Sequence, residues 1–450
     1  MRSYGASLRT LWARAGVISL AAPMLLGASA PTTIVSHPMV PAVGSHVHYE
    51  YINDVVELGI VRFSCQLAVP PTCYGPDQIR AAYGIQPILD AHITGAGRTI
   101  VIIDAYQSPT IASDLAHFDA LWGLPAPPRF EIVTPDCHPN FCPTSFNVND
   151  ANQVGWSSEI SLDVEWAHAI APGAAIVLVL APSHHDDDIL RVTKWAVDNN
   201  IGDVISQSFG EAEMCADPEL IRQEHALFDL ANDKGITLVA ASGDQGAAQP
   251  TCDESSFIRS ASTPASDPQV TAVGGTLLVA EPRTGAYQSE SAWHDSTGGT
   301  GGGFSTIYRR PGYQAPLQDN NKQRGVPDVA FDGAMGSGVI GAWSVLCGIR
   351  VNCAPTGGVG YVRFWGTSAG TPQWAGIVAL ADQMGGHRLG SINKTLYHIG
   401  KSDAYGSAFH DVNVGHNGFM GITGFNAADG WDAATGLGTP RVAALIPLLI

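Results

Sequence analysis

The sequence predicts an α/β fold in which helices cover both faces of a mostly parallel sheet. From residue 74 onward, short apolar runs typical of buried strands alternate with longer segments of helical spacing. Polar or acidic residues follow several of these runs, and this is where functional sites collect in open α/β sheets. Of the 450 residues, 45% are hydrophobic and only 14% are charged, so the composition allows a sizeable core.

The expected elements follow one another in order along the chain. The expected strands are residues 98–104, 174–181, 203–210, 236–244, 269–278 and 357–365. The expected helices are residues 75–85, 108–124, 159–172, 184–200, 219–235 and 373–384. The cluster at 156–158 (WSS) is expected to cap the third helix, because serine side chains accept hydrogen bonds from free N–H groups.

The first thirty residues are expected to form a signal peptide. Three arginines precede an apolar run at 15–26, and an Ala-Ser-Ala sequence follows it. The alternative is an uncleaved membrane anchor, although the run is short for a membrane span. Residues 31–72 are then expected to form a short N-terminal extension, and residues 73–450 a catalytic domain.

The charge balance limits the possible partners. The chain has 23 Lys and Arg residues against 41 Asp and Glu residues, a formal charge of -18. Such a surface argues against nucleic acid and against an anionic membrane, and it suits an acidic medium. We expect an exported monomer.

The eight cysteines fit an exported protein and occur as sequence neighbours. Eight cysteines allow 105 connectivities, and we expect neighbour pairing because each pair brackets a loop rich in Pro, Asn or Gly. The alternative is a zinc site, but no CxxC spacing is present. The expected pairs are Cys65/Cys73, Cys137/Cys142, Cys215/Cys252 and Cys347/Cys353.

Ser368 is the candidate nucleophile. It lies in GTSAG, between the expected strand 357–365 and the helix, where its own N–H and the helix dipole favour negative charge. Pro372 is expected near the first helical position. The alternative is an ordinary helix cap.

Three carboxyl groups are candidates to assist this serine. Glu159 and Asp163 are four residues apart on an apolar helix, so they share a face and raise at least one pKa if they are buried. The alternative is an exposed acidic face. Asp244 follows a strand in ASGDQG and would donate a hydrogen bond to an oxyanion if protonated; the alternative is a turn aspartate.

A histidine base has no recognisable position in the sequence. A subtilisin-type enzyme would show His-Gly-Thr at the start of a helix, and this tripeptide does not occur. The proton acceptor would then be a carboxylate, which works best in acid.

Several further segments occur in one order together with these residues. The segments are GWSSEISLDVEWAHAIAPGA, VISQSFG, ASGDQG, PASDPQVTAVGGT, GGGFS, VPDVAFD, GTSAGTP, and FHDV followed by GWDAATGLGTP. In this order they resemble the sedolisins, the serine-carboxyl peptidases, from about residue 74 to the C-terminus. The resemblance implies a subtilisin-like fold and peptide hydrolysis at low pH.

The resemblance also implies roles for the candidate residues. Ser368 would be the nucleophile and Glu159 its general base, oriented by Asp163. Asp244 and the Ser368 N–H would hold the oxyanion, and Asp104 would extend the carboxylate network. The segment at 206–210 and the glycine-rich loop at 296–304 would lie beside the substrate backbone.

The C-terminal segment resembles the calcium loop of this family, and one Ca²⁺ ion is expected. Asp411 and Asp432 would supply carboxylates, and Val412, Ala428 and Gly430 would supply carbonyl oxygens. The alternative is a loop stabilised by ordinary Asx turns.

Two rival functions remain open, the first because of a departure from the family pattern. Only about forty residues separate the signal from Cys73, whereas sedolisins usually carry a long propeptide. A catalytically silent, calcium-stabilised binding protein is therefore one rival. The other is a neutral hydrolase that uses His168, which is on the Glu159 helix but two and a half turns away.

Overall fold

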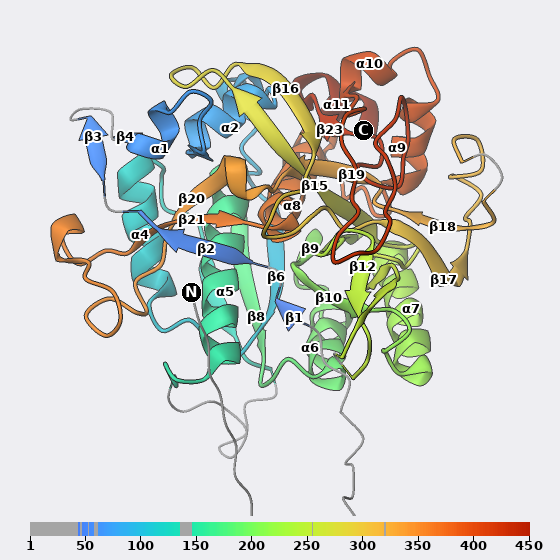
Figure 1. Cartoon of the computed structure of the whole chain (residues 1–450), viewed down its shortest axis with the longest axis horizontal. Helices are drawn as coiled ribbons and strands as arrows, with labels where there is room; N and C mark the ends of the chain where they lie inside the picture. Colours follow the sequence, from blue (N-terminus) through green and yellow to red (C-terminus); the bar gives the residue numbers. More distant parts are fainter. Residues whose placement is uncertain are drawn as a thin grey trace, which may run out of the picture. The chain divides into compact units, whose positions relative to one another are not determined.

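The computed structural model describes residues 44–45, 47–52, 54–57, 62–135, 146–253, 255–318 and 321–450. These residues form one long sheet, and helices cover both faces of the sheet (Figure 1). The strands of this sheet are β6 (Thr99–Ala105), β7 (Phe130–Val133), β8 (Ala175–Ala181), β9 (Val204–Gln207), β11 (Thr237–Ala241), β15 (Thr271–Ala280), β16 (Tyr287–Ala292) and β19 (Val329–Asp332).

The sheet is mostly parallel, as the sequence predicts. Its strand order is β16-β15-β11-β9-β6-β8-β7, and β19 also pairs with β15. The pairings are parallel except that of β15 with β16. The strands at the centre are apolar on both faces, because helices cover both.

The longer helices lie on both faces of the long sheet, with α5 and α8 in one core and α6 and α7 in the other. The helices are α1 (Ser64–Leu67), α2 (Pro76–Ala82), α3 (Gln86–Asp90), α4 (Ile111–Trp122), α5 (Ala151–Ile170), α6 (Asp186–Asp198), α7 (Pro218–Asp233), α8 (Thr367–Gly385), α9 (Asn393–Gly400), α10 (Tyr405–Ala408) and α11 (Val442–Leu449).

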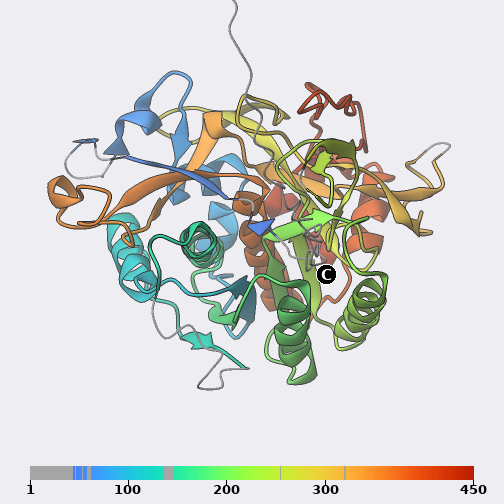
Figure 2. The ribbon, with the colours of Figure 1, turned by 60° about the horizontal axis from the view of Figure 1, so that its bottom comes forward.

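Alternate residues of β6 and β8 define the two cores. Ile100 and Ile102 pack into the core that contains α5 and α8. Val101 and Ile103 pack into the core that contains α6 and α7. Figure 2 shows α6 and α7 (green) side by side, away from α5 and α8.

Smaller sheets flank the long one. A four-stranded sheet has the order β2 (His48–Tyr51), β21 (Tyr361–Trp365), β20 (Gly338–Ala342), β5 (Cys73–Tyr74), and a three-stranded sheet the order β1 (Gly44–Ser45), β10 (Phe209–Ala212), β14 (Ser262–Thr263). Two-stranded pairs are β3 (Val55–Glu57) with β4 (Arg62–Phe63), β12 (Ala248–Pro250) with β13 (Phe257–Arg259), β17 (Gly303–Arg309) with β18 (Gln323–Val326), and β22 (Phe409–His410) with β23 (Thr439–Pro440). Two 3₁₀ turns are Met335–Ser337 and Ala354–Thr356.

Two local expectations were wrong. The cluster at 156–158 is not a cap: α5 begins earlier, where the Asp150 side chain accepts hydrogen bonds from the N–H groups of Asn152 and Gln153. Pro372 lies inside α8 and not at its first position, because the helix already begins at Thr367 after Gly366. The strand expected before Ser368 is present as β21, and it pairs antiparallel with β20 and β2 outside the long sheet.

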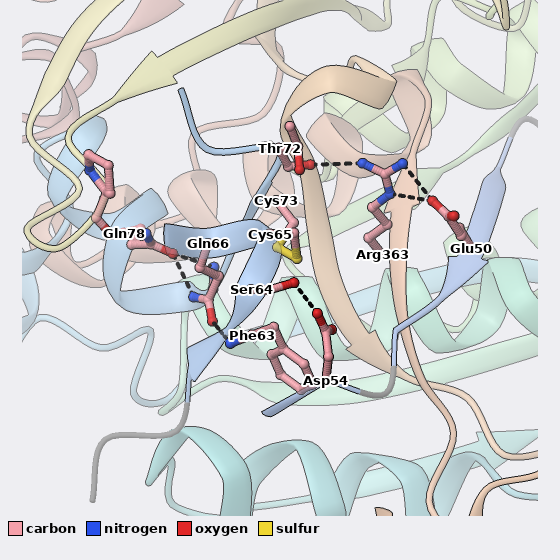
Figure 3. The surroundings of a disulfide bond; sticks show 12 residues. Glu50, Asp54, Phe63, Ser64, Cys65, Gln66, Thr72, Cys73, Gln78 and Arg363 are labelled. Atoms are coloured by element: carbon pink, nitrogen blue, oxygen red, sulfur yellow. Dashed lines mark hydrogen bonds and ion pairs between the residues drawn. A yellow bond between two sulfur atoms is a disulfide. The ribbon is translucent and has the colours of Figure 1, made fainter. Parts of the chain in front are cut away.

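The predicted neighbour pairing of cysteines is confirmed for three pairs. The disulfides are Cys65–Cys73 (Figure 3), Cys215–Cys252 and Cys347–Cys353. Cys137 and Cys142 lie outside the described residues. Within the described ranges, no helix has both the length and the apolar character needed to cross a membrane.

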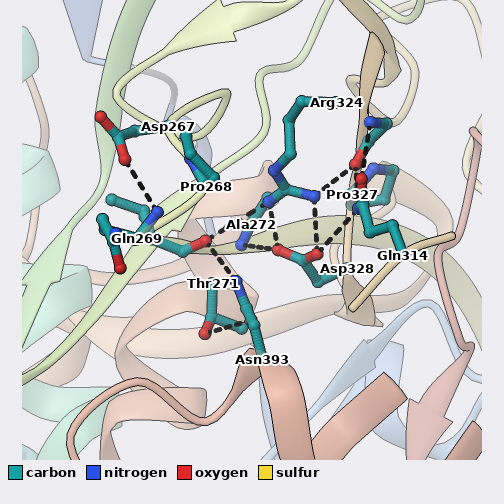
Figure 4. A network of polar contacts seen from close by, with 12 residues as sticks. Asp267, Pro268, Gln269, Thr271, Ala272, Gln314, Arg324, Pro327, Asp328 and Asn393 are labelled. Carbon is teal, nitrogen blue, oxygen red and sulfur yellow. Dashed lines mark hydrogen bonds and ion pairs between the residues drawn. The ribbon is translucent and has the colours of Figure 1, made fainter. Parts of the chain in front are cut away.

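A buried ion pair joins β18 to the segment that leads into β19 (Figure 4). The guanidinium of Arg324 donates to both carboxylate oxygens of Asp328, at 2.7 and 2.5 Å, and both side chains are 0% exposed. Asp328 also accepts from the N–H of Ala272 on β15 at 2.8 Å and from the hydroxyl of Tyr397 at 2.9 Å. These bonds tie β15 to the segment that leads into β19.

Candidate active site

Three carboxyl groups are buried where β6 meets α5. Asp104 lies near the carboxyl end of β6, and Glu159 and Asp163 lie in the middle of α5. All three residues are 0% exposed. The alternative of an exposed acidic face is therefore wrong, and the predicted burial of the pair is confirmed.

Burial and mutual repulsion set the protonation of this group. Burial raises the pKa of Asp104 well above its ordinary value, and the charges of Asp163 and Glu159 raise it further. Burial also raises the pKa of Asp163, against a hydrogen bond from Ser208 that lowers it. Because like charges at close range cannot all ionise, the group holds protons well above the pH at which free carboxyl groups release them.

Ser208 connects this group to Ser368. The Ser208 hydroxyl donates to a carboxylate oxygen of Asp163 at 2.8 Å, and the Ser208 carbonyl accepts from the Ser368 hydroxyl at 3.3 Å. Ser368 is the second residue of α8, and it is buried. From the sequence, the segment 206–210 was expected only to lie beside the substrate backbone. The contact of the Ser208 side chain with Asp163 was missed.

Asp244 lies on the other side of Ser368. One of its oxygens accepts from the N–H of Thr367 at 2.7 Å and from the Thr367 hydroxyl at 2.8 Å. Gly243, at φ +105°, donates its own N–H to the same hydroxyl at 3.1 Å. Thr367 therefore fixes Asp244 beside the start of α8, a link that the sequence did not suggest.

Burial raises the pKa of Asp244 to about 8, against the two Thr367 bonds that lower it. Its carboxyl group is therefore neutral in acid and carries a proton that it can donate. The alternative, a turn aspartate, does not by itself account for a carboxyl group that is only 4% exposed. Because Asp244 is bonded to Thr367, the residue before Ser368, a neutral carboxyl donor lies next to the start of α8.

Residues of the N-terminal extension also reach the site. The N–H of Val47 donates to a carboxylate oxygen of Glu159 at 3.0 Å. The His48 ring lies 3.8 Å from Asp244, measured from Nε2 to the carboxyl oxygen that does not bind Thr367. No sequence period marks these two residues, since their partners are more than a hundred positions away.

His168 is engaged by groups outside the candidate site. It is 0% exposed, and its Nε2 lies 2.8 Å from the Pro125 carbonyl and 3.2 Å from Asp119. Its position on α5 does not favour a role as base for the serine.

The C-terminal loop gathers acidic groups around Tyr405. The Tyr405 hydroxyl donates to Asp411 at 2.9 Å. Burial raises the pKa of this tyrosine, and the charges of Asp411, Asp432 and Asp429 raise it further. Burial raises the pKa of Asp432 to about 6. A cation bound at this position would favour the charged forms of Tyr405 and Asp432 and so lower both pKa values.

The carbonyl and carboxylate oxygens of this loop are ligands of the type that calcium prefers. Asp432 at present accepts from the N–H groups of Ala428, Ala434 and Thr435, and Asp411 accepts from that of Gly430. The Val412 carbonyl accepts from the Thr435 hydroxyl at 3.1 Å. Among the described residues, no three His, Cys, Asp or Glu side chains are arranged as a metal-binding group. A calcium ion would therefore rely on backbone carbonyls in addition to the two carboxylates.

Comparison with known proteins agrees with the fold and the motifs. A family model described as the subtilase family matches residues 148–389. Kumamolisin from Bacillus sp. (strain MN-32) is 32% identical over 395 residues, which are 84% of this chain and 64% of the relative. Sedolisin from Pseudomonas sp. (strain 101) is 34% identical over 368 residues, which are 78% of this chain and 58% of the relative.

A solved structure gives the same result. Pseudomonas sedolisin complexed with two molecules of pseudo-iodotyrostatin superposes with a TM-score of 0.68 at 28% identity, over 83% of this chain and 97% of that one. This chain spans less than two thirds of the length of the two curated relatives. The predicted subtilisin-like fold is confirmed, and the chain belongs to the sedolisins, the serine-carboxyl peptidases, within the subtilase family.

Proposed function

We propose that the chain is a secreted, acid-acting serine-carboxyl endopeptidase that hydrolyses peptide bonds through an acyl-enzyme. The single observation that carries this proposal is the hydrogen-bonded path from Asp163 through Ser208 to Ser368, with Glu159 and Asp104 buried beside it. The family membership supports the same reaction class. Peptides or unfolded proteins are the proposed substrates, and a monomer is the proposed state.

Ser368 is the proposed nucleophile and Glu159 its general base. The Ser368 hydroxyl attacks the carbonyl carbon of the substrate, and Glu159 accepts the hydroxyl proton. Asp163 and Asp104 hold Glu159 in position and share protons with it. Glu159 then returns the proton to the leaving amine, and in the second half-reaction it activates the water that releases the acyl group.

Asp244 and the Ser368 N–H are proposed to hold the oxyanion. Charge develops on the carbonyl oxygen as the tetrahedral intermediate forms, and a neutral carboxyl group donates to it without leaving a like charge nearby. Thr367 keeps the other oxygen of Asp244 occupied as an acceptor, which leaves the protonated oxygen to face the substrate.

We further propose that Asp411, Asp432 and the carbonyls of Val412, Ala428 and Gly430 hold one Ca²⁺ ion when it is bound. The ion would neutralise the acidic loop and stabilise the fold at a distance from the reacting atoms. Metal analysis of the purified protein, with thermal unfolding before and after chelation, tests this. The expected result is about one calcium per chain and a lower unfolding temperature after chelation; an unchanged temperature and no bound metal would contradict it.

Export is proposed from the signal-like residues 1–30, and the three disulfides support an oxidising compartment. N-terminal sequencing of the protein recovered from culture medium tests this. A secreted chain that begins after residue 30 is expected. A chain recovered only in cells with Met1 intact would contradict it.

The principal test is cleavage of an acid-denatured protein from about pH 2.5 to 7.5. Wild type is compared with Ser368→Ala, with Glu159→Gln and with the surface control Glu219→Arg. Activity confined to acid, lost in the first two variants and kept in the third, is expected. A folded, calcium-loaded protein without activity at any pH would favour the silent binding protein, and a maximum near neutrality would favour a histidine-based hydrolase.

A further inference from the structure

A buried glutamate lies directly after β10, the strand that follows Ser208. Glu213 is only 1% exposed, and its N–H donates to the carbonyl of Ala261 at 3.1 Å. Its carboxyl group reaches across to β17. One oxygen accepts from the Ser305 hydroxyl at 2.7 Å, and the other accepts from the Thr306 hydroxyl at 2.8 Å and from the Thr306 N–H. One side chain therefore binds two consecutive residues that are 92 and 93 positions away along the chain.

These bonds coincide with an irregularity in the pairing of β17. This strand pairs antiparallel with β18 at its first two residues and then only at its last residue, Arg309. In the gap, the Thr306 N–H donates to Glu213. The next two N–H groups along the strand donate to the Ser305 hydroxyl, at 3.1 and 2.9 Å. Glu213 thus takes the place of the partner strand over this gap, which is a bulge of the kind found beside active sites.

The two segments that Glu213 joins contact different parts of the candidate site. Before β10, the Ser208 carbonyl accepts from the Ser368 hydroxyl at 3.3 Å. Before β17, the N–H of Gly299 donates to the Asp244 carbonyl at 2.9 Å. One segment therefore contacts the proposed nucleophile, and the other contacts the residue proposed to hold the oxyanion.

The loop before β17 is packed too closely to absorb a movement of this strand. A Cβ at Gly301 would collide with the Ser242 carbonyl, and a Cβ at Gly302 would collide with the Ala433 carbonyl. The Ser242 hydroxyl also donates to the Gly301 carbonyl at 2.7 Å. The loop is therefore fixed at its start, and Glu213 fixes the strand a few residues further on.

We propose that Glu213 is a positioning residue that holds β10 and β17 at the separation a bound peptide needs. This inference rests on the proposed function, because the two strands continue segments that contact Ser368 and Asp244. Walls that are already fixed need no ordering when an extended peptide enters, so the tether contributes to substrate binding. The bonds of Ser208 and Asp244 to their own partners do not pass through Glu213, so the chemical step depends on it little.

The tether can be removed from either side, and the chain offers a matched control. Glu213→Ala removes the acceptor, whereas Glu213→Gln keeps an acceptor oxygen in a side chain of the same shape. Thr306→Val removes only the hydroxyl on the other side, at an exposed position. Glu219→Ala is the control, because it truncates the same residue type where the side chain is 59% exposed.

The first readout does not depend on activity. Amide hydrogen exchange of residues 303–309 is followed by mass spectrometry in full chains that also carry Ser368→Ala, and urea unfolding establishes that each chain is folded. Glu213→Ala is expected to speed this exchange about tenfold, and Thr306→Val to speed it less. Glu213→Gln and the control are expected to change it little. Unchanged exchange in both Glu213→Ala and Thr306→Val would overturn the tether.

The second readout is the split between KM and kcat. It uses a quenched-fluorescence peptide whose sequence is cut in acid-denatured haemoglobin, and chains that mass spectrometry shows to have the same N-terminus. Glu213→Ala is expected to raise KM about tenfold and to leave kcat within about twofold, because only binding is weakened. Glu213→Gln is expected to restore most of the binding. Adding Thr306→Val to Glu213→Ala is expected to raise KM no further, because both changes remove the same contact.

The possible failures have different signatures. A lower kcat at unchanged KM would show only a loss of active protein and would overturn the positioning role, as would additive effects of Glu213→Ala and Thr306→Val. Absence of hydrolysis in every folded chain, the Glu219→Ala control included, would instead overturn the proposed function and with it the role in substrate binding. Faster amide exchange in Glu213→Ala would still establish the tether in that case.

Discussion

Replacing Asp244 with asparagine tests the charge state on which the proposed oxyanion site depends. The amide has the same shape as the carboxyl group and still accepts from Thr367, but it does not ionise. Burial raises the pKa of Asp244 from 3.8 to about 8, so the folded chain keeps a proton that the unfolded chain releases. The free energy of unfolding must therefore depend on pH through this one residue.

The sign follows from proton counting. Between pH 3.8 and about 8 the folded state binds more protons at Asp244 than the unfolded state, so stability falls as pH rises across this window. From pH 4 to pH 7 the difference spans about 3 pH units at about 1.4 kcal/mol each, or about 4 kcal/mol. Asp244→Asn removes this loss, so the variant is expected to be more stable than its parent at pH 7 but not at pH 4.

The assay is urea unfolding at pH 4 and at pH 7 in a Ser368→Ala background, which prevents self-digestion. Asp403→Asn, at an exposed position, is the control for removing one carboxyl group. The parent is expected to lose about 4 kcal/mol more than the Asp244→Asn chain between the two pH values. Parallel losses within about 1 kcal/mol would show that Asp244 is ionised in the folded protein and would refute the neutral donor.

Three further variants test other parts of the structure. Asp244→Ala is expected to lower kcat by about 10²–10³ in acid, and Asp244→Asn by less because its amide still donates; equal losses would contradict this. Arg324→Met leaves Asp328 buried without its partner and is expected to cost about 3–5 kcal/mol in urea unfolding, most of which Arg324→Met with Asp328→Leu should recover. Replacing Cys215 and Cys252 by serine opens a loop of 37 residues and is expected to cost about 4 kcal/mol; a change below about 1 kcal/mol would show that the unfolded chain is constrained in another way.

The sequence predicts the parallel sheet well because each strand is marked by a short apolar run within its own residues. The apolar runs of β6, β8 and β11 are buried on both faces, so each run is recognisable without knowledge of its neighbours. The run that became β21 is also largely apolar, yet it pairs antiparallel with β20. Pairing partners depend on tertiary contacts, and composition does not encode them.

The candidate site likewise has residues that the sequence predicts and residues that only tertiary contacts bring there. Glu159, Asp163, Asp244 and Ser368 belong to motifs that are readable along the chain. The contribution of the Ser208 hydroxyl depends on a contact with a helix forty-five residues away. The N-terminal segment showed no period, because its two short strands use hydrogen-bonding edges supplied by β10 and β21.

The proposed loss of activity as the pH rises above neutrality would have two physical causes in this structure, and they differ in time. Ionisation of Asp244 near pH 8 would remove the proposed oxyanion donor at once and would reverse at once when acid is restored. Burial also raises the pKa of Asp332, Glu165 and Glu290, which lie outside the site, so the whole fold loses stability as pH rises. Unfolding is slow by comparison. Activity that returns fully after seconds at pH 8 but not after hours would therefore assign the early loss to ionisation and the late loss to the fold.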